Sequence, residues 1–474
     1  MERKNQQYNG LKEECGVFGI YDINGHDTAR ITYYALHALQ HRGQESAGIA
    51  ISNGKIIDYH KGNGLVTEVF NDKNISELRG RVAIGHVRYS TTGLNQIYNA
   101  QPIVVRYRNG YLALAHNGNL VNADELRKEL EESGSIFQTS TDTEIIVHLI
   151  ARYITKGMVE AVKMAMQKIK GAYSLVIMTE KALYAVKDPN GLRPLCIGLL
   201  DDSYCFASES CAFDVIGARL IREVSPGEIV EVSEDGIKSY ALEGQKKEAF
   251  CIFEYIYFSR PDSVIRGISV YAVRREMGRR LAMEYPVDAD LIVPVPDSGI
   301  PAASGYSEVS GIPYGEGLVK NKYVGRTFIQ PDQAHREIAV RLKLNVLAES
   351  IRGKRIVLVD DSIVRGTTSK RLVSMLRSAG AKEVHLRISA PPVKFPCYFG
   401  IDTPSRKELI GSKASVEDIR KMIGADSLGY LSIDGLLSCF DHVGFCTGCF
   451  DGNYPIKVPE EGSKFKFEAG VCYG

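Results

Sequence analysis

The stretch RIVLVDDSIVRGTTSKRLV, residues 355–373, constrains the fold of this chain more than any other segment. It begins with a continuous apolar run that ends at Asp360 and Asp361, and a loop containing Gly366 leads into a segment with helical periodicity. Residues 290–299 and 383–392 contain similar apolar runs. Strands without polar alternation are buried on both faces, as in a parallel sheet covered by helices. The second half therefore predicts an α/β domain.

The first half has a different pattern. From residue 15 to about 245, short apolar strands alternate with turn signals. The dipeptides Asn109-Gly110 and Asp235-Gly236 predict hairpins with type I′ turns.

Three helical segments lie between the predicted strands of this half. They begin at Asp27, at Asn122 and at residue 141. Antiparallel strands with a few long helices indicate an α+β domain with helices packed on stacked sheets. We expect this domain to span residues 15–248, and the α/β domain with a C-terminal extension to span residues 249–474.

Composition excludes several classes of protein. The 474 residues include 58 Lys and Arg against 57 Asp and Glu, so the net charge of +1 offers no bulk attraction for nucleic acid or an anionic membrane. No apolar run approaches the roughly 20 residues that span a bilayer. Ten cysteines without a secretory signal suggest a reducing compartment, so we expect a cytoplasmic protein.

The loop after the 355–360 strand can bind a phosphorylated sugar. Asp360 and Asp361 can accept hydrogen bonds from a ribose diol and hold Mg²⁺ through oxygen. Gly366, Thr367 and Thr368 open a helix, whose N-terminus attracts phosphate. Asp-Asp-Ser alone is more often a turn after a strand. The segment is neither a Walker loop nor a dinucleotide fingerprint.

The full string resembles the signature of the type I phosphoribosyltransferases, which bind 5-phosphoribosyl 1-pyrophosphate (PRPP). The segment PVPDSG resembles the pyrophosphate loop of that family. The resemblance implies PRPP binding by residues of both loops and Mg²⁺ binding by Ser298, Asp360 and Asp361. The PRPP-binding residues would be Asp360, Asp361, Ser362, Val364, Arg365, Gly366, Thr367, Thr368, Asp297, Ser298 and Gly299.

The segment from Lys320 to Asn345 is rich in cations and only weakly periodic. It fits a lid that closes over an anionic substrate, with Lys320 and Arg326 facing it. A solvated basic surface is the alternative.

Cys15 precedes the apolar run GVFGI, after a polar leader of fourteen residues. A thiol needs a base to become a nucleophile. If residues 1–14 are a propeptide, the freed α-amino group of Cys15, with an ordinary pKa of about 7.7–8.0, can be that base. A small buried hydrophobe is the alternative for a lone cysteine.

Four motifs accompany Cys15: LQHRGQESAGIA, GHVRYSTTG, LAHNGNL and TSTDTE. Together they resemble the glutaminase domain of class II amidotransferases, which are N-terminal nucleophile (Ntn) hydrolases. By that resemblance Asn117 and Gly118 would form the oxyanion hole and Arg42 would line the site. The glutamine-binding residues would be Arg88 and Thr91, for the α-carboxylate, and Asp142, for the α-amino group.

The two halves together resemble the glutamine phosphoribosylpyrophosphate amidotransferases. The resemblance implies that ammonia from glutamine attacks C1 of PRPP, giving 5-phosphoribosylamine, glutamate and pyrophosphate, the first committed step of purine synthesis. It also implies homo-oligomers, dimers or tetramers, and inhibition by purine nucleotides. The alternatives are an amidotransferase with another ammonia acceptor and a non-catalytic PRPP sensor.

Cys446 and Cys449 have C-x-x-C spacing, which needs further ligands to complete a metal site. In the iron-sulfur branch of the family the other ligands match Cys251 and Cys397. The resemblance implies a [4Fe-4S] cluster on these four cysteines, whereas the spacing alone also suits zinc. The remaining cysteines have no such pattern, and we expect them to be core or incidental residues: Cys196, Cys205, Cys211, Cys439 and Cys472.

Overall fold

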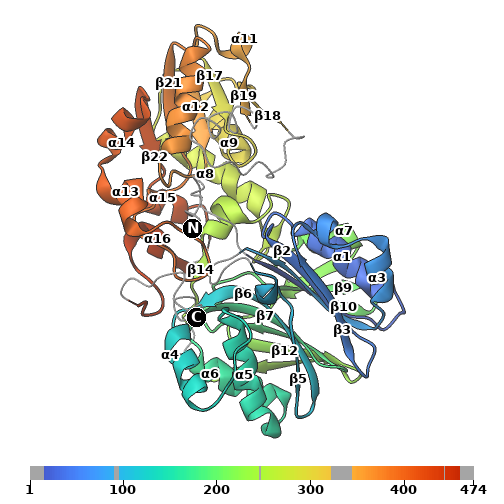
Figure 1. Cartoon of the computed structure of the whole chain (residues 1–474). Coiled ribbons are helices and arrows are strands. Elements are labelled where there is room, and N and C mark those ends of the chain that lie inside the picture. The colour runs from blue at the N-terminus through green and yellow to red at the C-terminus, as the bar shows by residue number, and fades with distance from the viewer. Residues whose placement is uncertain (1–14, 90–95, 245–246, 322–343, 442–443, 460–474) are drawn as a thin grey trace, which may run out of the picture.

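The computed structural model describes residues 15–89, 96–244, 247–321, 344–441 and 444–459. Figure 1 shows two lobes, one from the first half of the chain and one from the second. The leader and the expected site residues Thr91 and Arg326 lie outside the described residues, as does Cys472.

The first half contains two antiparallel sheets. The seven-stranded sheet has the order β11-β9-β10-β1-β4-β2-β3, and the six-stranded sheet has the order β13-β12-β8-β7-β6-β5. The strands of the first are β1 (Gly16–Tyr21), β2 (Ser46–Ser52), β3 (Ile57–Asn63), β4 (Val82–Arg88), β9 (Cys196–Leu200), β10 (Ser203–Ala207) and β11 (Arg219–Glu223). Those of the second are β5 (Ile103–Tyr107), β6 (Gly110–Leu120), β7 (Gly171–Met178), β8 (Leu183–Lys187), β12 (Glu228–Ser233) and β13 (Gly236–Ala241).

The two sheets stack face to face, and helices cover their outer faces. Val17 of β1 and Val176 of β7 belong to one buried cluster between the sheets. The seven-stranded sheet packs against α1 (Thr28–Ala38), α2 (Val66–Val69), α3 (Asp72–Glu77) and α7 (Cys211–Ile216). The six-stranded sheet packs against α4 (Ala123–Glu132), α5 (Thr143–Tyr153) and α6 (Met158–Lys168). The short 3-10 helices are η1 (Ile97–Asn99) and η2 (Ile154–Lys156). These layers confirm the predicted α+β domain of stacked sheets.

Both predicted hairpins form, but the prediction that their turns are of type I′ is wrong. Tyr107 pairs with Gly110, and Ser233 pairs with Gly236, so each turn lies one residue earlier than expected. The turn residues lack the positive φ of a type I′ turn, which instead occurs at Gly110 and Gly236. The residue after each turn, a glycine, therefore adopts the positive φ that the chain reversal needs, as in a hairpin closed by a glycine bulge.

The second half is built on a four-stranded parallel sheet with the order β17-β20-β21-β22. Its strands are β17 (Leu291–Pro294), β20 (Arg355–Asp360), β21 (Glu383–Ile388) and β22 (Ser427–Tyr430). Ile356 and Leu358 pack with α12 (Thr367–Ser378) and α14 (Val416–Ile423), whereas Val357 packs with α8 (Val270–Glu284) and α9 (Ile300–Ser310). Burial on both faces confirms the predicted parallel-sheet α/β domain.

Shorter elements complete this half. They are β14 (Phe250–Cys251), the π-helix η3 (Glu254–Phe258), β15 (Val264–Ile265), β16 (Ile268–Ser269), β18 (Leu318–Lys320), β19 (Leu344–Val346), α11 (Ala348–Ile351), η4 (Arg406–Glu408), α13 (Ile410–Lys413), α15 (Ile433–Leu437), β23 (Phe445–Cys446) and α16 (Gly448–Asp451). Strand β14 pairs in parallel with β23, which joins the start of this half to its C-terminal part.

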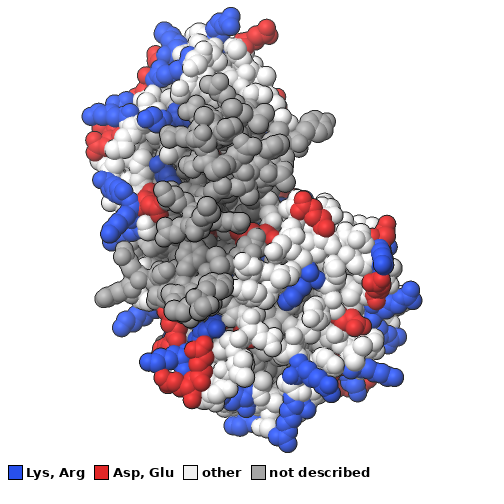
Figure 2. Space-filling view, in the orientation of Figure 1, with Lys and Arg blue, Asp and Glu red and all other residues white. Residues whose placement is uncertain are grey.

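The surface agrees with the near-zero net charge. Figure 2 shows acidic and basic side chains on the described surface of both lobes. Among the described helices, none is both long enough and apolar enough to cross a bilayer.

Candidate active sites

Cys15 immediately precedes β1, the strand between β10 and β4 in the seven-stranded sheet. The side chain is buried, and its thiol donates to the carbonyl oxygen of Tyr89 at 3.4 Å. Burial raises the pKa of this thiol to about 11, although the Tyr89 hydrogen bond and the charge of Arg88 act in the opposite direction. With residue 14 attached, Cys15 is therefore a protonated thiol at neutral pH.

Arg42 contacts the backbone of Cys15. Its Nε donates to the Cys15 carbonyl oxygen at 3.1 Å, and the guanidinium is fully buried. The next residue must be glycine, since a Cβ on Gly43 would lie 2.6 Å from the amide nitrogen of Arg88. The motif QHRGQ thus places Arg42 against the backbone of Cys15 and Gly43 against the end of β4.

Asn117 and Gly118 are neighbours on β6 and pair with Ser174 and Tyr173 of β7. The Asn117 side chain is buried, and its Nδ2 has no hydrogen-bond partner among the described residues. Gly118 has φ +149°, and a Cβ there would collide with the carbonyl oxygen of Ala172. An unpaired buried amide is a donor available to a ligand oxygen.

Asp142 precedes α5, and its Oδ2 accepts from the Leu120 amide at 2.8 Å. Arg88 ends β4, and both Asp142 and Arg88 lie close enough to Cys15 to influence its pKa. An acidic and a basic side chain therefore lie in the neighbourhood of the cysteine. Thr91 belongs to the same expected set but lies outside the described residues.

Two buried histidines lie beside these residues. His86 Nε2 contacts the His116 carbonyl oxygen at 3.0 Å, and burial lowers the pKa of His86 to about 3. A neutral His86 is therefore the donor in this contact. His116 Nδ1 lies 3.1 Å from Thr143 Oγ1 and 3.8 Å from Asp142 Oδ1. In the sequence, only their position inside the motifs GHVRYSTTG and LAHNGNL links these two histidines to the site.

Asp360 is the last residue of β20, Asp361 follows it directly, and both are buried. The Asp361 amide donates to Asp360 Oδ1 at 2.9 Å, and Ser362 Oγ donates to Asp361 Oδ2 at 2.5 Å. Burial and the neighbouring charge of Asp361 hold the pKa of Asp360 well above its usual value. Bound cations or hydroxyl donors would favour the ionised pair.

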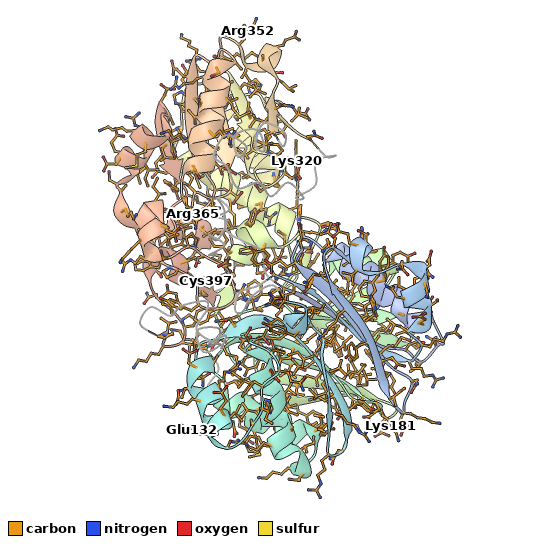
Figure 3. All side chains as sticks on the ribbon, viewed as in Figure 1. Glu132, Lys181, Lys320, Arg352, Arg365 and Cys397 are labelled. Atoms are coloured by element: carbon orange, nitrogen blue, oxygen red, sulfur yellow. The ribbon has the colours of Figure 1, made fainter. Side chains whose placement is uncertain are left out.

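The rest of this loop leads into α12. Gly366 has φ +77° and precedes the helix, which begins with Thr367 and Thr368. Arg365, labelled in Figure 3, donates to Glu408 at 3.0 Å, and the Val364 carbonyl accepts from Ile410 at 2.9 Å.

The expected pyrophosphate loop lies beside these acids. Pro294 of β17 pairs in parallel with Val359 of β20, so the loops that follow these two strands both lie at the carboxyl end of the sheet. A Cβ on Gly299 would collide with the Val359 carbonyl, which explains glycine there. Asp297 pairs with Lys320 at 2.5 Å, while the other expected lid residue, Arg326, lies outside the described chain.

The four cysteines expected to hold a cluster lie in one neighbourhood. Cys251 and Cys446 are directly opposite in the β14–β23 pair. Burial, and then the thiols of Cys251, Cys446 and Cys397, hold the pKa of Cys449 well above its usual value. Cys397, near the junction of the lobes in Figure 3, accepts from the Phe399 amide at 3.4 Å.

Within the described ranges, no group of three or more His, Cys, Asp or Glu is arranged to hold a metal ion. The nine described cysteines are free thiols, and Cys196, Cys205 and Cys211 are buried in the core as expected.

A cavity of about 370 Å³ lies in the first half, apart from these residues. It is lined by Lys55, Tyr107, Glu180 and Lys181 among others, and contains none of the predicted site residues.

Comparison with known proteins matches each half to a family. Residues 86–215 match a glutamine amidotransferase domain, and residues 269–396 match a phosphoribosyl transferase domain. The amidophosphoribosyltransferase of Bacillus subtilis (strain 168) is 53% identical over 460 residues, covering 95% of this chain and 96% of that protein. The enzyme of the same name from Archaeoglobus fulgidus is 51% identical over 94% of this chain and 99% of its own length.

The fold agrees with these relatives. A solved structure described as glutamine phosphoribosylpyrophosphate amidotransferase from B. subtilis complexed with ADP and GMP has a TM-score of 0.89 and 52% identity, covering 94% of this chain and 98% of that chain. Similarity at this level spans both halves and both candidate sites. The chain therefore belongs to the amidophosphoribosyltransferase family.

Proposed function

We propose that this protein transfers ammonia from glutamine to PRPP, producing 5-phosphoribosylamine, glutamate and pyrophosphate at the start of purine synthesis. The observation that carries the proposal is the presence of two sites in one chain. One site contains Cys15, Arg88 and Asp142, and the other contains Asp360 and Asp361 at the carboxyl end of a parallel sheet. Relatives at about half identity over nearly the full length bear the corresponding name.

The glutaminase half begins with removal of residues 1–14. In the unprocessed chain the nitrogen of Cys15 is part of a peptide bond and cannot act as a base. Once freed, the α-amino group takes the thiol proton and the thiolate attacks the amide carbon of glutamine. Arg88 and Thr91 bind the α-carboxylate and Asp142 binds the α-amino group.

The oxyanion that forms is stabilised by Asn117 Nδ2 and the Gly118 amide. Ammonia leaves, and water hydrolyses the thioester to glutamate and free Cys15. A buried, unpaired Nδ2 suits this role because it needs little reorganisation when the oxyanion forms.

The phosphoribosyltransferase half binds PRPP between two loops. Residues 362–368 and the start of α12 bind the 5′-phosphate, and residues 297–299 bind the pyrophosphate. Asp360 and Asp361 bind the ribose hydroxyls and stabilise the positive charge that develops on the sugar as pyrophosphate leaves C1. Lys320 and Arg326 close over the substrate.

Mg²⁺ and a [4Fe-4S] cluster are the cofactors we propose. The carboxylate pair with a raised pKa at Asp360 fits Mg²⁺, held by Asp360, Asp361 and Ser298 together with substrate oxygens. Mg²⁺ would neutralise the leaving pyrophosphate. Cys251, Cys397 and Cys446 lie close enough to Cys449 to influence its pKa, and these four thiols would be the ligands that hold the cluster.

We further propose that the enzyme is a cytoplasmic homo-oligomer that purine nucleotides inhibit. A relative whose structure contains ADP and GMP supports nucleotide binding.

The decisive variant is Cys15→Ala. It should lose pyrophosphate formation with glutamine and keep it with ammonia, because the second half does not use the thiol. Loss of both activities in folded protein would contradict the proposed division of labour.

A further inference from the structure

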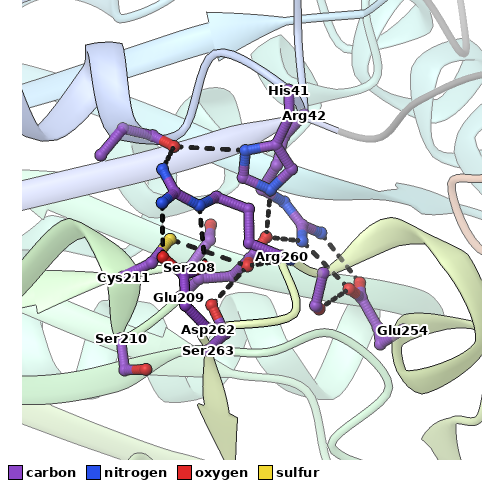
Figure 4. Close-up of polar contacts among 12 residues, drawn as sticks. His41, Arg42, Ser208, Glu209, Ser210, Cys211, Glu254, Arg260, Asp262 and Ser263 are labelled. Carbon is purple, nitrogen blue, oxygen red and sulfur yellow. Dashed lines mark hydrogen bonds and ion pairs between the residues drawn. The ribbon is translucent and has the colours of Figure 1, made fainter. Parts of the chain in front are cut away.

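A buried network of charges joins the two halves behind Cys15. Arg42 Nη1 donates to Glu209 at 2.6 Å, and both terminal nitrogens of Arg42 donate to Glu254, at 3.0 and 2.8 Å. Figure 4 shows Arg42 reaching between these two carboxylates. Glu254 belongs to η3 at the start of the second half, whereas Arg42 and Glu209 belong to the first. All three side chains are fully buried.

Arg193 extends this network to a second place. Its Nη1 lies 3.5 Å from Glu254 Oε1, and its Nε and Nη2 donate to the Phe399 carbonyl oxygen at 2.8 and 2.7 Å. Arg193 comes from the first half and is fully buried. One guanidinium thus contacts both the start and the C-terminal part of the second half.

The segment that Arg193 binds lies against the oxyanion strand. The Tyr398 carbonyl accepts from Asn119 Nδ2 at 2.9 Å. A Cβ on Gly400 would lie 3.2 Å from the backbone of Gly118. Residues 398–400 therefore support the β6 strand at the residue whose amide binds the oxyanion.

We propose that Arg193 and Glu254 are positioning residues for glutamine hydrolysis, an inference that rests on the proposed function. Through Arg42, Glu254 fixes the Cys15 carbonyl, and through Phe399, Arg193 fixes the segment beneath Gly118. The nucleophile and the oxyanion donor are thereby set relative to each other by groups from both halves. Neither residue touches the reacting atoms.

Buried ionic groups suit this task because their geometry is restricted. Arg42 and Arg193 carry two positive charges, and Glu209 and Glu254 carry two negative ones. Removal of one charge leaves the buried network with an excess of the opposite charge, so the remaining groups must shift. Lysine cannot replace Arg193 fully, since a single ammonium lacks the planar fork that binds a carboxylate and a carbonyl together.

The test uses the full-length enzyme with its leader removed and compares Arg193→Lys with Glu254→Gln. We expect kcat for glutamine hydrolysis to fall ~10- to 100-fold, with KM for glutamine changed less than about threefold. Alkylation of Cys15 by a chloroketone analogue of glutamine should slow in parallel. Ammonia-dependent pyrophosphate formation should stay within about twofold of the parent, because the second site is intact.

Arg222→Lys is the matched control. Arg222 binds Glu228 bidentately at 2.7 and 2.8 Å within the first half, and neither residue belongs to a candidate site, so the change should alter none of these rates. Equal loss of glutamine and ammonia activities would overturn the positioning role, as would unchanged hydrolysis. Glutamate release measured without PRPP tests the positioning role by itself, so the result can be interpreted even if the protein does not transfer ammonia to PRPP.

Discussion

The α-carbon of Gly118 lies 3.2 Å from the position that a Cβ on Gly400 would occupy. Gly118 is in the first half and Gly400 in the second, so the two halves meet at the backbone proposed to bind the oxyanion. Gly400 has φ +113°, which a side chain disfavours independently of the contact.

Gly400→Ala should therefore lower glutamine-dependent activity more than ammonia-dependent activity. The added Cβ presses on Gly118 and shifts its amide, for an expected loss of ~10-fold or more in kcat for glutamine. Initial rates with each nitrogen source measure the effect.

Gly311→Ala is the control for backbone strain. Gly311 has φ +72° and no atom within 4 Å of its Cβ position, so alanine there costs about 1–2 kcal/mol of stability without touching a site. Equal effects of the two variants on the ratio of activities would show that the Gly400 contact is irrelevant to catalysis.

Asp360→Asn should abolish transfer with either nitrogen source. The change removes one carboxylate from the pair at the end of β20, and with it ribose binding and charge stabilisation, so we expect kcat for pyrophosphate release to fall ~100-fold or more. Glutamine hydrolysis without PRPP should persist, since Cys15 lies in the other half. A variant that still forms pyrophosphate at the parent rate would remove Asp360 from the proposed site.

The reactivity of Cys15 should depend on processing. With the leader attached, a pKa of about 11 leaves ~1 thiolate in 10,000 at pH 7, and alkylation should quicken about tenfold per pH unit up to pH 11. Chain beginning at Cys15 should react rapidly near pH 8, because the free amine acts as base. Mass spectrometry separates the two forms, and similar neutral-pH rates for both would contradict the proposed role of the leader.

Anaerobically purified protein should contain iron and acid-labile sulfide in equal amounts. Cys446→Ser should lose both, because one of the four thiolate ligands is removed. Metal analysis and the visible absorption spectrum report the result, and stoichiometric zinc without sulfide would reject the cluster. Cys439→Ser is the control, because the Cys439 thiol donates a hydrogen bond to the Gly435 carbonyl oxygen and Cys439 lies outside the proposed ligand set.

Local sequence was sufficient to predict much of the architecture. Asp27 caps α1 through its side chain, Asn122 directly precedes α4, and the apolar run at 356–359 is a strand buried on both faces. The hairpin turns were wrong because a glycine can take its positive φ either within the turn or just after it, and the dipeptide does not distinguish the two.

The support of the sites was harder to predict. Arg193 contacts Phe399 across 206 residues, and Arg42 contacts Glu254 across 212. Nothing in the sequence distinguishes an arginine that will be buried from one that will be exposed. The carboxylate that pairs with a buried arginine is known only once the two halves are packed together. Sequence motifs were enough to identify the residues proposed to contact substrate. The residues that position those side chains could be identified only from the folded structure.

The most direct test measures glutamate and pyrophosphate in one reaction, with glutamine, PRPP and Mg²⁺ each present or omitted. The two products should appear in equal amounts, and omission of PRPP or Mg²⁺ should remove pyrophosphate. Glutamate formed in the complete mixture without pyrophosphate would contradict ammonia transfer to PRPP, the central claim for this chain.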